Sequence, residues 1–468
     1  MNIPIGDDFP AFVDLTPDAV DGHLSLSRFF SQINEHRILY DRIFWIGGLW
    51  LFSAVNFKIL LLIGNFSLIL FVLFFNKIGK ELQQNGWMTA TMACLFLSWV
   101  GYSNSLCSMM ALQNFTFPLM VCAGLWMMSV KQDLKGILGG LFLLALAFFT
   151  TGIGFLAMFC GMLVLLIRKM RKEALIATGI SLVFVLVYFS FYEKSPVQSS
   201  LFAGLSQPVE LLTRYFAFIG GILPISALSP LPEAALGLAL SASLLYSVIR
   251  LGKRLPLHLT AITIFFLLLA AIVVAARFEL NEFIANRFKI NSAVIFACIV
   301  LLLAHALPKN KIRNLFVTGV FLFAAALLMF SYKSYNDYRF WVDEFACDLL
   351  NANHGIETTA YQPKGQKYIR ASFSDSKFQS VYSGLSEEAI LQDLIPARMN
   401  GLETGNYSLN TDVLAKGQIS RPVLVCMNEQ DDVLGYLPVH FSGMRIIDKH
   451  GILKRASGMK LFLGDLRH

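Results

Sequence analysis

The chain has 468 residues, of which 56% are hydrophobic and only 15% are charged. Soluble globular proteins carry about 25% charged residues, so this composition excludes an ordinary soluble enzyme. The 41 phenylalanines and 16 methionines also need more interior than a compact soluble domain of this length provides. We therefore predict an α-helical polytopic membrane protein. Its net charge of +7 is interpreted through the positions of the basic residues, not as a nucleic-acid footprint.

Ten apolar runs with few or no charges predict membrane helices, because about 20 apolar residues are needed to cross the bilayer core. The runs cover residues 59–75, 88–100, 109–130, 137–149, 155–167, 174–192, 234–249, 259–276, 293–307 and 315–330. Several are short and need flanking residues, so we expect roughly nine to eleven membrane helices. Two interrupted runs, at residues 43–55 and 211–228, predict interfacial or re-entrant segments that do not cross.

Basic residues cluster at five junctions between these runs, whereas the turns near residues 103–107 and 150–152 carry no charge. The clusters are Lys77/Lys80, Lys131/Lys135, Arg168/Lys169/Arg171/Lys172, Arg250/Lys253/Arg254 and Lys309/Lys311/Arg313. The positive-inside rule assigns all five to the cytoplasmic side if the spans alternate. The opposite side then receives residues 1–42, the loops at 193–207 and 277–289, and the whole segment 331–468.

Residues 333–468 are polar and rich in turn signals. They predict a small α/β extracytoplasmic domain that follows a transmembrane domain at residues 43–332. Residues 423–427 predict a buried strand, and residues 444–447 and 459–463 predict two strands paired with each other. Cys347 and Cys426 fall in this domain, where an oxidising compartment permits a disulfide. Two separate thiols are an equal alternative, because the sequence does not supply the geometry that a disulfide needs.

The predicted N-terminal extracytoplasmic loop, residues 1–42, contains the acidic pair Asp7 and Asp8 within the stretch PIGDDF. Two adjacent carboxylates suit a general base, or they suit a divalent cation such as Mg²⁺ or Mn²⁺, which prefers oxygen ligands. Enclosure at a membrane boundary raises the proton affinity of a carboxylate unless a cation offsets it. The alternative is that both residues are solvated in a disordered tail.

The stretch Asn34-Glu35-His36-Arg37, followed by Arg42, concentrates hydrogen-bonding side chains ahead of an apolar run. Arginine is the residue best suited to forked contacts with phosphate, so a phosphate site is one interpretation. The other is a charged cap that anchors the next helix at the membrane surface.

The outer loop at residues 277–289 carries Arg277 and Arg287, and arginine on this side opposes the usual orientation bias. Either these arginines bind an anionic head group or pyrophosphate, or they pair internally with Glu279 and Glu282. Two further polar stretches interrupt apolar runs, at residues 113–114 and 150–154. Each either lines a cavity or serves helix packing alone.

These features resemble the GT-C class of membrane glycosyltransferases, and more closely the bacterial enzymes that modify O-antigen with glucose. The resemblance rests on PIGDDF at residues 4–9, on QINEHRI at residues 32–38 with Arg42, and on the loop framed by Arg277 and Arg287. It covers residues 1–332; the outer domain adds only a general likeness.

The resemblance implies an inverting hexosyltransferase at the outer face of the bacterial inner membrane. Such enzymes move a sugar from a polyprenyl-phosphate donor to a lipid-linked or surface polysaccharide acceptor. Asp7 or Asp8, with Glu35 as a second candidate, would activate the acceptor hydroxyl or help to hold a metal ion. The leaving phosphate would be stabilised by His36, Arg37, Arg42, Arg277 and Arg287. Relatives carry a hydrophobic helix ahead of the acidic loop, so we expect an upstream native start, or a lost helix and lost activity.

Two other functions remain as alternatives. A flippase for a lipid-linked sugar would use the same basic loops without chemistry, but such transporters have internal repeats and charges near the bilayer midplane, and neither is evident here. A non-enzymatic assembly or sensor protein would work through its outer domain. The sequence contains no CxxC, HExxH, EF-hand, Walker or GxSxG motif, so zinc, calcium, nucleotide and serine-hydrolase chemistry have no local support.

Overall fold

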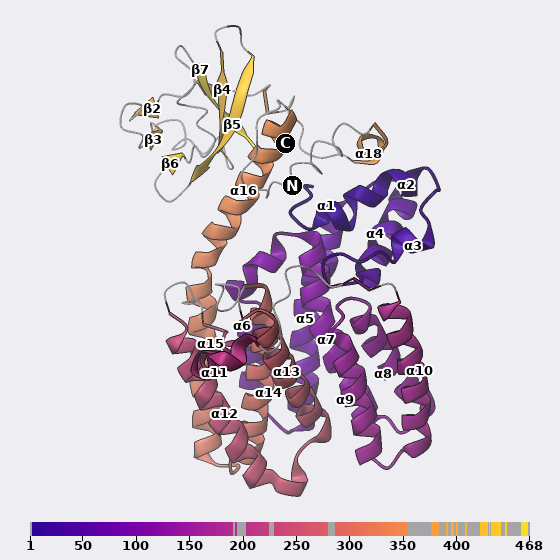
Figure 1. The fold of residues 1–468 in the computed structure, drawn as a ribbon. Coiled ribbons are helices and arrows are strands. Elements are labelled where there is room, and N and C mark those ends of the chain that lie inside the picture. The colour runs from indigo at the N-terminus through magenta and orange to yellow at the C-terminus, as the bar shows by residue number, and fades with distance from the viewer. Residues whose placement is uncertain are drawn as a thin grey trace.

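A bundle of apolar helices forms the main body of the protein in a computed structural model (Figure 1). A smaller domain with a β-sheet lies beyond one end of this bundle. The structure describes residues 2–190, 192–193, 203–223, 229–278, 286–353, 376–382, 390–391, 395–396, 399–400, 408–409, 422–428, 430, 432–440, 445–446 and 460–466.

Ten apolar helices of the described chain correspond one to one with the ten predicted runs. Seven are long and apolar enough to cross a membrane. They are α5 (Phe57–Glu81), α7 (Ser108–Val130), α10 (Arg171–Phe189), α12 (Leu231–Leu251), α13 (Leu257–Ala276), α14 (Lys289–Ala306) and α15 (Lys311–Ser331). Three are shorter: α6 (Gly86–Phe96), α8 (Leu134–Phe148) and α9 (Gly154–Ile167). The prediction of many apolar helices is confirmed, and their composition supports a membrane protein.

The ten helices alternate in direction, and the five basic junctions gather at the end of the bundle far from the sheet domain. Contacts across this end join different junctions. The Lys309 ammonium donates to the side chain of Gln83, and the Arg168 guanidinium donates to the carbonyl of Met128 at 2.6 Å. The opposite end carries the N-terminal residues and the sheet domain (Figure 1).

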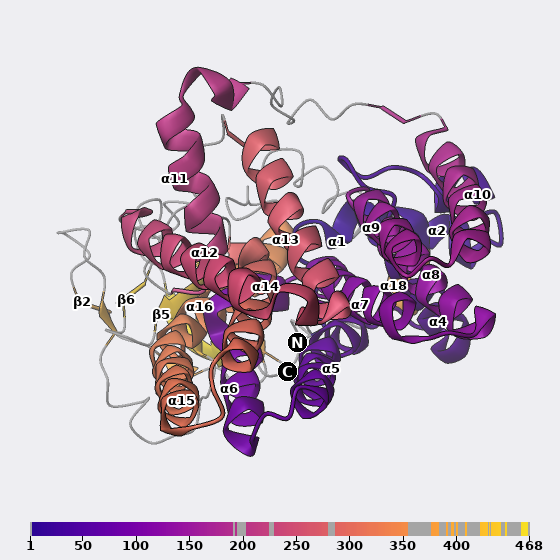
Figure 2. The same ribbon diagram turned by 90° about the horizontal axis from the view of Figure 1, so that it is seen from below.

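The two interrupted apolar runs form short helices. Helix α4 (Leu39–Phe52) has 14 residues and α11 (Pro208–Ile219) has 12. At 1.5 Å per residue they measure about 21 and 18 Å. Viewed along the bundle axis, α11 lies at the periphery beside α12 and α13 (Figure 2). Neither helix is among the seven helices long and apolar enough to cross a membrane.

The predicted N-terminal loop is a folded cap. It contains α1 (Asp8–Ala11), α2 (Thr16–Val20), α3 (Leu26–Phe29) and the 3-10 turn η1 (Val13–Leu15). Phe9 and Phe12 are fully buried, and the Phe12 ring stacks on Trp45 of α4 with centroids 6.1 Å apart. The Asn2 side chain accepts the first backbone N–H of α5, that of Phe57, at 2.7 Å. This packing excludes a disordered tail for Asp7 and Asp8.

Helix α15 is followed after one residue, Tyr332, by α16 (Lys333–Asn353), which carries the chain from the bundle to the sheet (Figure 1). A short helix, α18 (Ser376–Val381), meets the cap through an ion pair between Lys377 and Asp21. The predicted domain boundary at residue 333 is thus crossed by two nearly continuous helices.

The described strands form one antiparallel sheet in the order β1-β7-β4-β5-β6-β3-β2. They are β1 (Ile395–Pro396), β2 (Met399–Asn400), β3 (Ser408–Leu409), β4 (Pro422–Met427), β5 (Val433–His440), β6 (Arg445–Ile446) and β7 (Lys460–Asp465). The buried strand predicted at residues 423–427 is confirmed as β4. The predicted pairing of the last two strands is wrong, because β7 pairs with β4 and β6 pairs with β5. We missed β5, whose Gly435 and Pro438 resemble turn residues.

The two cysteines of the C-terminal domain are separate buried thiols in this structure. Cys347 on α16 shares an apolar cluster with Val423 and Val425 of β4. Side chains alternate between the two faces of a strand, so Cys426 lies on the face of the sheet opposite this cluster. A disulfide between Cys347 and Cys426 therefore does not form here, because the sheet separates the two side chains.

One apolar cluster outside the bundle joins three parts of the chain that lie far apart in the sequence. It contains Phe9 and Phe12 of the cap, Leu350 of α16, and Val423 of β4 with Tyr436 of β5. The cap is therefore packed between the bundle and the C-terminal domain. The second and larger cluster lies inside the helix bundle.

Candidate functional site

A tight turn presents Glu35 and His36 at the end of the bundle nearest the cap. The backbones of Ile33 and His36 exchange two hydrogen bonds, at 2.8 and 2.9 Å, around Asn34 and Glu35. Asn34 adopts a positive φ of 50°, a conformation that asparagine tolerates better than most residues. The turn is tied to the bundle because Leu39 donates its N–H to the Phe149 carbonyl at 2.9 Å.

Glu35 forms an ion pair with Arg277, which lies 242 residues later at the end of α13. An Arg277 Nη2 atom lies 2.8 Å from Glu35 Oε1, and both side chains are mostly buried. The prediction that the N-terminal motif and the late arginine loop meet at one end of the molecule is confirmed by this contact. Pairing of Arg277 with Glu279 or Glu282 is not addressed, because both acids lie outside the described residues.

His36 lies beside the ion pair. Its Nδ1 atom is 3.2 Å from the Thr151 hydroxyl, and its Nε2 atom is 3.7 Å from Glu35 Oε1. Burial lowers the pKa of His36 to about 4; Glu35 opposes this shift, whereas Arg277 and Arg287 reinforce it. The imidazole is therefore neutral at physiological pH. It can offer a hydrogen bond to an anion but not a positive charge.

Arg287 lies near Arg277, where its backbone carbonyl and the ring of Phe288 hold it in place. The guanidinium carbons of Arg277 and Arg287 each lie 5.2 Å from the centroid of the Phe288 ring, within cation–π range. The Arg287 carbonyl accepts a 3.0 Å hydrogen bond from Asn104, which in turn accepts one from Asn114 at 2.9 Å. Asn104 is fully buried, and sequence reasoning missed it because a single asparagine in an uncharged turn gives no signal.

Asp7 is the acid of the pair that faces this cluster. Burial raises the pKa of Asp7, attraction to Arg287 lowers it, and repulsion from Glu35 raises it again. The side chain is only partly buried. Within the described part of the chain, no hydrogen bond reaches the Asp7 carboxylate. It is therefore a partly exposed carboxylate with increased proton affinity, and Arg287 is the cation that acts on it.

Asp8 has the opposite surroundings. Its side chain is fully buried at the start of α7 and accepts hydrogen bonds from the backbone N–H groups of Ile5, Ser108 and Met109 at 3.0, 3.1 and 2.7 Å. The Cys107 thiol donates to it at 3.3 Å. Burial raises the pKa of Asp8 to about 6, although these hydrogen bonds oppose the shift. Asp8 thus anchors the N-terminus of α7, a placement that the helix dipole favours.

The two earlier arginines donate to backbone carbonyls. Arg37 reaches the carbonyls of Tyr188 and Ser190 at the end of α10, at 2.7 and 2.6 Å. Arg42 is almost fully buried and donates to the carbonyls of Phe29 and Ser31 at 2.7 and 2.8 Å, with longer contacts nearby. These contacts hold α10 and α3 in place. Of the five predicted phosphate ligands, only His36, Arg277 and Arg287 cluster together.

A cavity of about 250 Å³ opens beside the Glu35–Arg277 pair. Its polar lining residues are Glu35, His36, Gln113, Asn114, Thr151, Tyr188, Tyr192, Arg277 and Asn291. Asn291 is nearly buried, and its side-chain oxygen accepts no hydrogen bond from any described residue. That oxygen is a buried acceptor in the wall of the cavity. The two polar stretches that interrupt apolar runs do line a cavity, through Gln113, Asn114 and Thr151.

The remaining walls of the cavity are apolar and come from α7, α9, α10 and α13. They consist of Phe117, Ile153, Phe155, Phe189, Leu269, Ile272, Val273 and Ala276, with Phe288 beside Arg277. Phe155 and Phe189 are 43% and 44% exposed, so the apolar side of the cavity reaches the outer surface of the bundle. A single cavity therefore joins a charged end to the lipid-facing surface.

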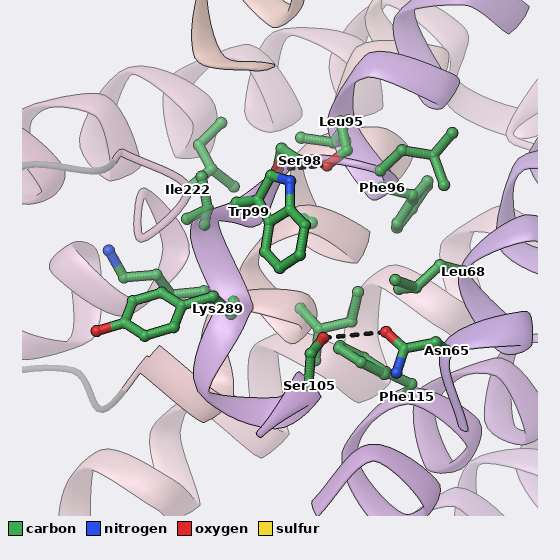
Figure 3. Close-up of a pocket in the computed structure, with 16 residues that line it drawn as sticks. Asn65, Leu68, Leu95, Phe96, Ser98, Trp99, Ser105, Phe115, Ile222 and Lys289 are labelled. Atoms are coloured by element: carbon green, nitrogen blue, oxygen red, sulfur yellow. Dashed lines mark hydrogen bonds between the residues drawn. The ribbon is translucent and has the colours of Figure 1, made fainter. Parts of the chain in front are cut away.

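A second cavity, of about 160 Å³, lies between α5, α6 and α14 (Figure 3). Its polar groups already have partners: Ser105 donates to the Asn65 side chain at 3.0 Å. The Lys289 ammonium, directed away from these residues in Figure 3, donates to the Leu223 carbonyl at 2.7 Å and lies 3.7 Å from Glu233. This cavity lacks the arginines and the acceptor without a donor that distinguish the first one.

The described acids do not form a metal centre. Asp8 uses both oxygens on the α7 terminus, whereas Asp7 faces Arg287. No group of three or more histidine, cysteine or acidic side chains suited to a metal ion occurs among the described residues. The donor set of Asp7 and Asp8 therefore does not fit a shared divalent cation, and no chemical step is assigned to one.

Comparison with known proteins gives no match: no family model, curated protein or solved structure is similar to this chain.

Proposed function

We propose that the protein is a membrane glycosyltransferase that moves a sugar from a polyprenyl-phosphate donor to a lipid-linked or surface polysaccharide. The observation that carries this proposal is the Glu35–Arg277 ion pair at the charged end of a half-apolar cavity. It supports a ligand with a phosphate and a long hydrocarbon chain, because each kind of wall matches one part of such a molecule. The inner-membrane location and the outward-facing site are parts of the same proposal.

The donor phosphate is bound by Arg277 and Arg287, and His36 adds a neutral hydrogen bond. Glu35 acts as a positioning residue, because it holds the Arg277 guanidinium at 2.8 Å. As the bond between the anomeric carbon and the phosphate oxygen breaks, negative charge grows on the phosphate. Fixed cations stabilise this charge more in the transition state than in the bound donor, so they accelerate transfer.

Asp7 is the proposed general base. It takes the proton from the acceptor hydroxyl as that oxygen forms its bond to the anomeric carbon, on the face opposite the leaving phosphate, so the configuration is inverted. A raised pKa suits this role, because a base with greater proton affinity accepts the proton more readily. The oxygen of Asn291 is suited to accept a hydrogen bond from a sugar hydroxyl.

The test is a reconstituted assay. The purified protein in vesicles receives a panel of hexoses on polyprenyl phosphate together with an acceptor glycan, and release of polyprenyl phosphate is measured. Arg277→Gln should lower the rate by about 10²-fold, comparable to the loss of one transition-state donor, whereas Arg277→Lys should retain part of the activity. Movement of the donor across the bilayer without release of polyprenyl phosphate would contradict the proposal and favour the flippase alternative.

A further inference from the structure

A groove of about 590 Å³ lies on another side of the molecule, between the N-terminal residues, the first turns of α5 and the start of α16. It shares no lining residue with the candidate site. Its apolar wall includes Leu61 and Leu62 of α5, and Leu62 is 67% exposed. Lys58 and Arg339 also line the groove and supply two cations.

Lys58 is placed unfavourably for a lysine. It occupies the first turn of α5, where the helix dipole presents its positive end and disfavours a cation. The side chain is exposed, and its ammonium contacts no acid in the described part of the chain. It also lies at the end of the bundle that lacks the five basic junctions. An anion bound beside Lys58 would neutralise its charge and so remove the unfavourable interaction with the helix dipole.

Aromatic side chains lie beside the groove, at the end of the apolar helices. Tyr332, Tyr335 and Tyr338 stack along the junction of α15 and α16, with successive centroids 5.6 and 6.3 Å apart. Trp99 packs against Tyr335 at 5.3 Å. Tyrosine and tryptophan concentrate at the level of lipid head groups. This aromatic band predicts that head-group phosphates lie at the level of the two cations, next to the exposed Leu62.

We propose that this groove binds an anionic membrane phospholipid, with the phosphate between Lys58 and Arg339 and an acyl chain along Leu61 and Leu62. Charge complementarity supports this occupant, since the described residues that line the groove include two cations and no acid. The apolar wall supports a lipid in preference to a soluble anion. This proposal is independent of the proposed glycosyl transfer.

The experiment measures lipid retention by native mass spectrometry of the full-length protein in detergent, with added phosphatidylglycerol or phosphatidylcholine. We expect preferential retention of phosphatidylglycerol, and about a fivefold loss of its affinity in Lys58→Gln, the value of one basic residue beside an anionic lipid. Lys80→Gln is the matched control, because Lys80 is equally exposed but lies in the last turn of the same helix. The control should retain phosphatidylglycerol like the wild type.

Equal retention of the two lipids by the wild type, or unchanged retention in Lys58→Gln, would overturn the proposal. Inorganic phosphate serves as a third probe: if it stabilises the wild type against heat as much as phosphatidylglycerol does, the groove binds free phosphate and the lipid assignment fails. Arg339→Gln should reproduce the loss seen with Lys58→Gln. Thermal unfolding of each variant in the absence of lipid verifies that the fold is retained.

Discussion

At the scale of single residues, the acidic pair separates into two different roles. The Asp8 carboxylate is surrounded by three backbone donors and a thiol, whereas the Asp7 carboxylate is influenced by Glu35 and Arg287. Asp8 thus serves the structure, whereas Asp7 serves the proposed chemistry. Replacing each aspartate separately by asparagine should distinguish these roles.

Asp7→Asn should abolish sugar transfer and leave thermal unfolding unchanged, because the Asp7 side chain makes no hydrogen bond that holds the described fold together. Asp8→Asn should lower the free energy of unfolding by about 1–3 kcal/mol, because its NH₂ group would face backbone donors. Detergent-solubilised unfolding curves and the transfer assay check both variants. A stable, inactive Asp8→Asn protein together with an active Asp7→Asn protein would reverse our assignment.

The pH dependence of transfer provides a second test at this scale. Arg287 attracts the ionised Asp7 carboxylate and so lowers its pKa, in opposition to burial. Arg287→Gln removes this attraction, the pKa of Asp7 rises, and the acidic limb of the rate profile should move to higher pH. We expect Arg277→Gln to reduce the rate without the same shift, because Arg277 is not among the groups that set the Asp7 pKa. Rate profiles of both variants between pH 4 and pH 9 make the comparison.

At the scale of secondary structure elements, small residues allow helices α11 and α12 to approach closely. A Cβ atom added at Gly237 of α12 would lie 1.9 Å from the Phe216 carbonyl oxygen, and one added at Gly220 would lie 2.0 Å from the Glu233 carbonyl oxygen. Contacts this short require the backbones to separate. The glycines therefore determine how closely α11, which precedes the span α12, packs against it.

Gly237→Ala should destabilise the protein by about 1–3 kcal/mol, the usual cost of inserting a methyl group into a closely packed interface. Gly179→Ala, in the middle of α10, is the matched control, since a Cβ atom there meets nothing within 4 Å. Replacement of glycine by alanine in an open helical position should be neutral or stabilising. Similar unfolding midpoints for the two variants would contradict the close approach.

At the scale of the whole molecule, the sequence predicted the helices better than the site. Charge-free runs and basic junctions are a direct consequence of a lipid environment. All ten apolar helices were therefore predictable, and so was the placement of Glu35 and Arg277 at the same end of the bundle. The separation of Asp7 from Asp8 was not, because it depends on where α7 begins in space. Arg37 and Arg42 have the same local pattern as phosphate ligands, yet backbone carbonyls 11 to 153 residues away occupy them. Such long-range partners leave no trace in local spacing.

The C-terminal domain illustrates the same limit. Strand β4 was evident from a continuous apolar stretch, but Gly435 and Pro438 concealed its partner β5, and the strands on either side were therefore paired wrongly. Helix α16 was also missed, because the change to polar composition after α15 suggests that the helical chain ends there. Its inner face is covered by the sheet, and that contact is a property of the assembled fold.

The apolar cluster shared by the cap and the C-terminal domain bears on how the protein can be dissected. Phe9, one residue after Asp8, is packed in the same cluster as Leu350 and Val423. Removing the C-terminal domain would expose to water the apolar face of the cap segment that carries Asp7, the proposed general base. Loss of transfer in a truncated protein would then report a loosened support for Asp7, and would not identify the missing domain as the seat of recognition. Point substitutions on the solvent side of the sheet are the cleaner way to ask what that domain contributes.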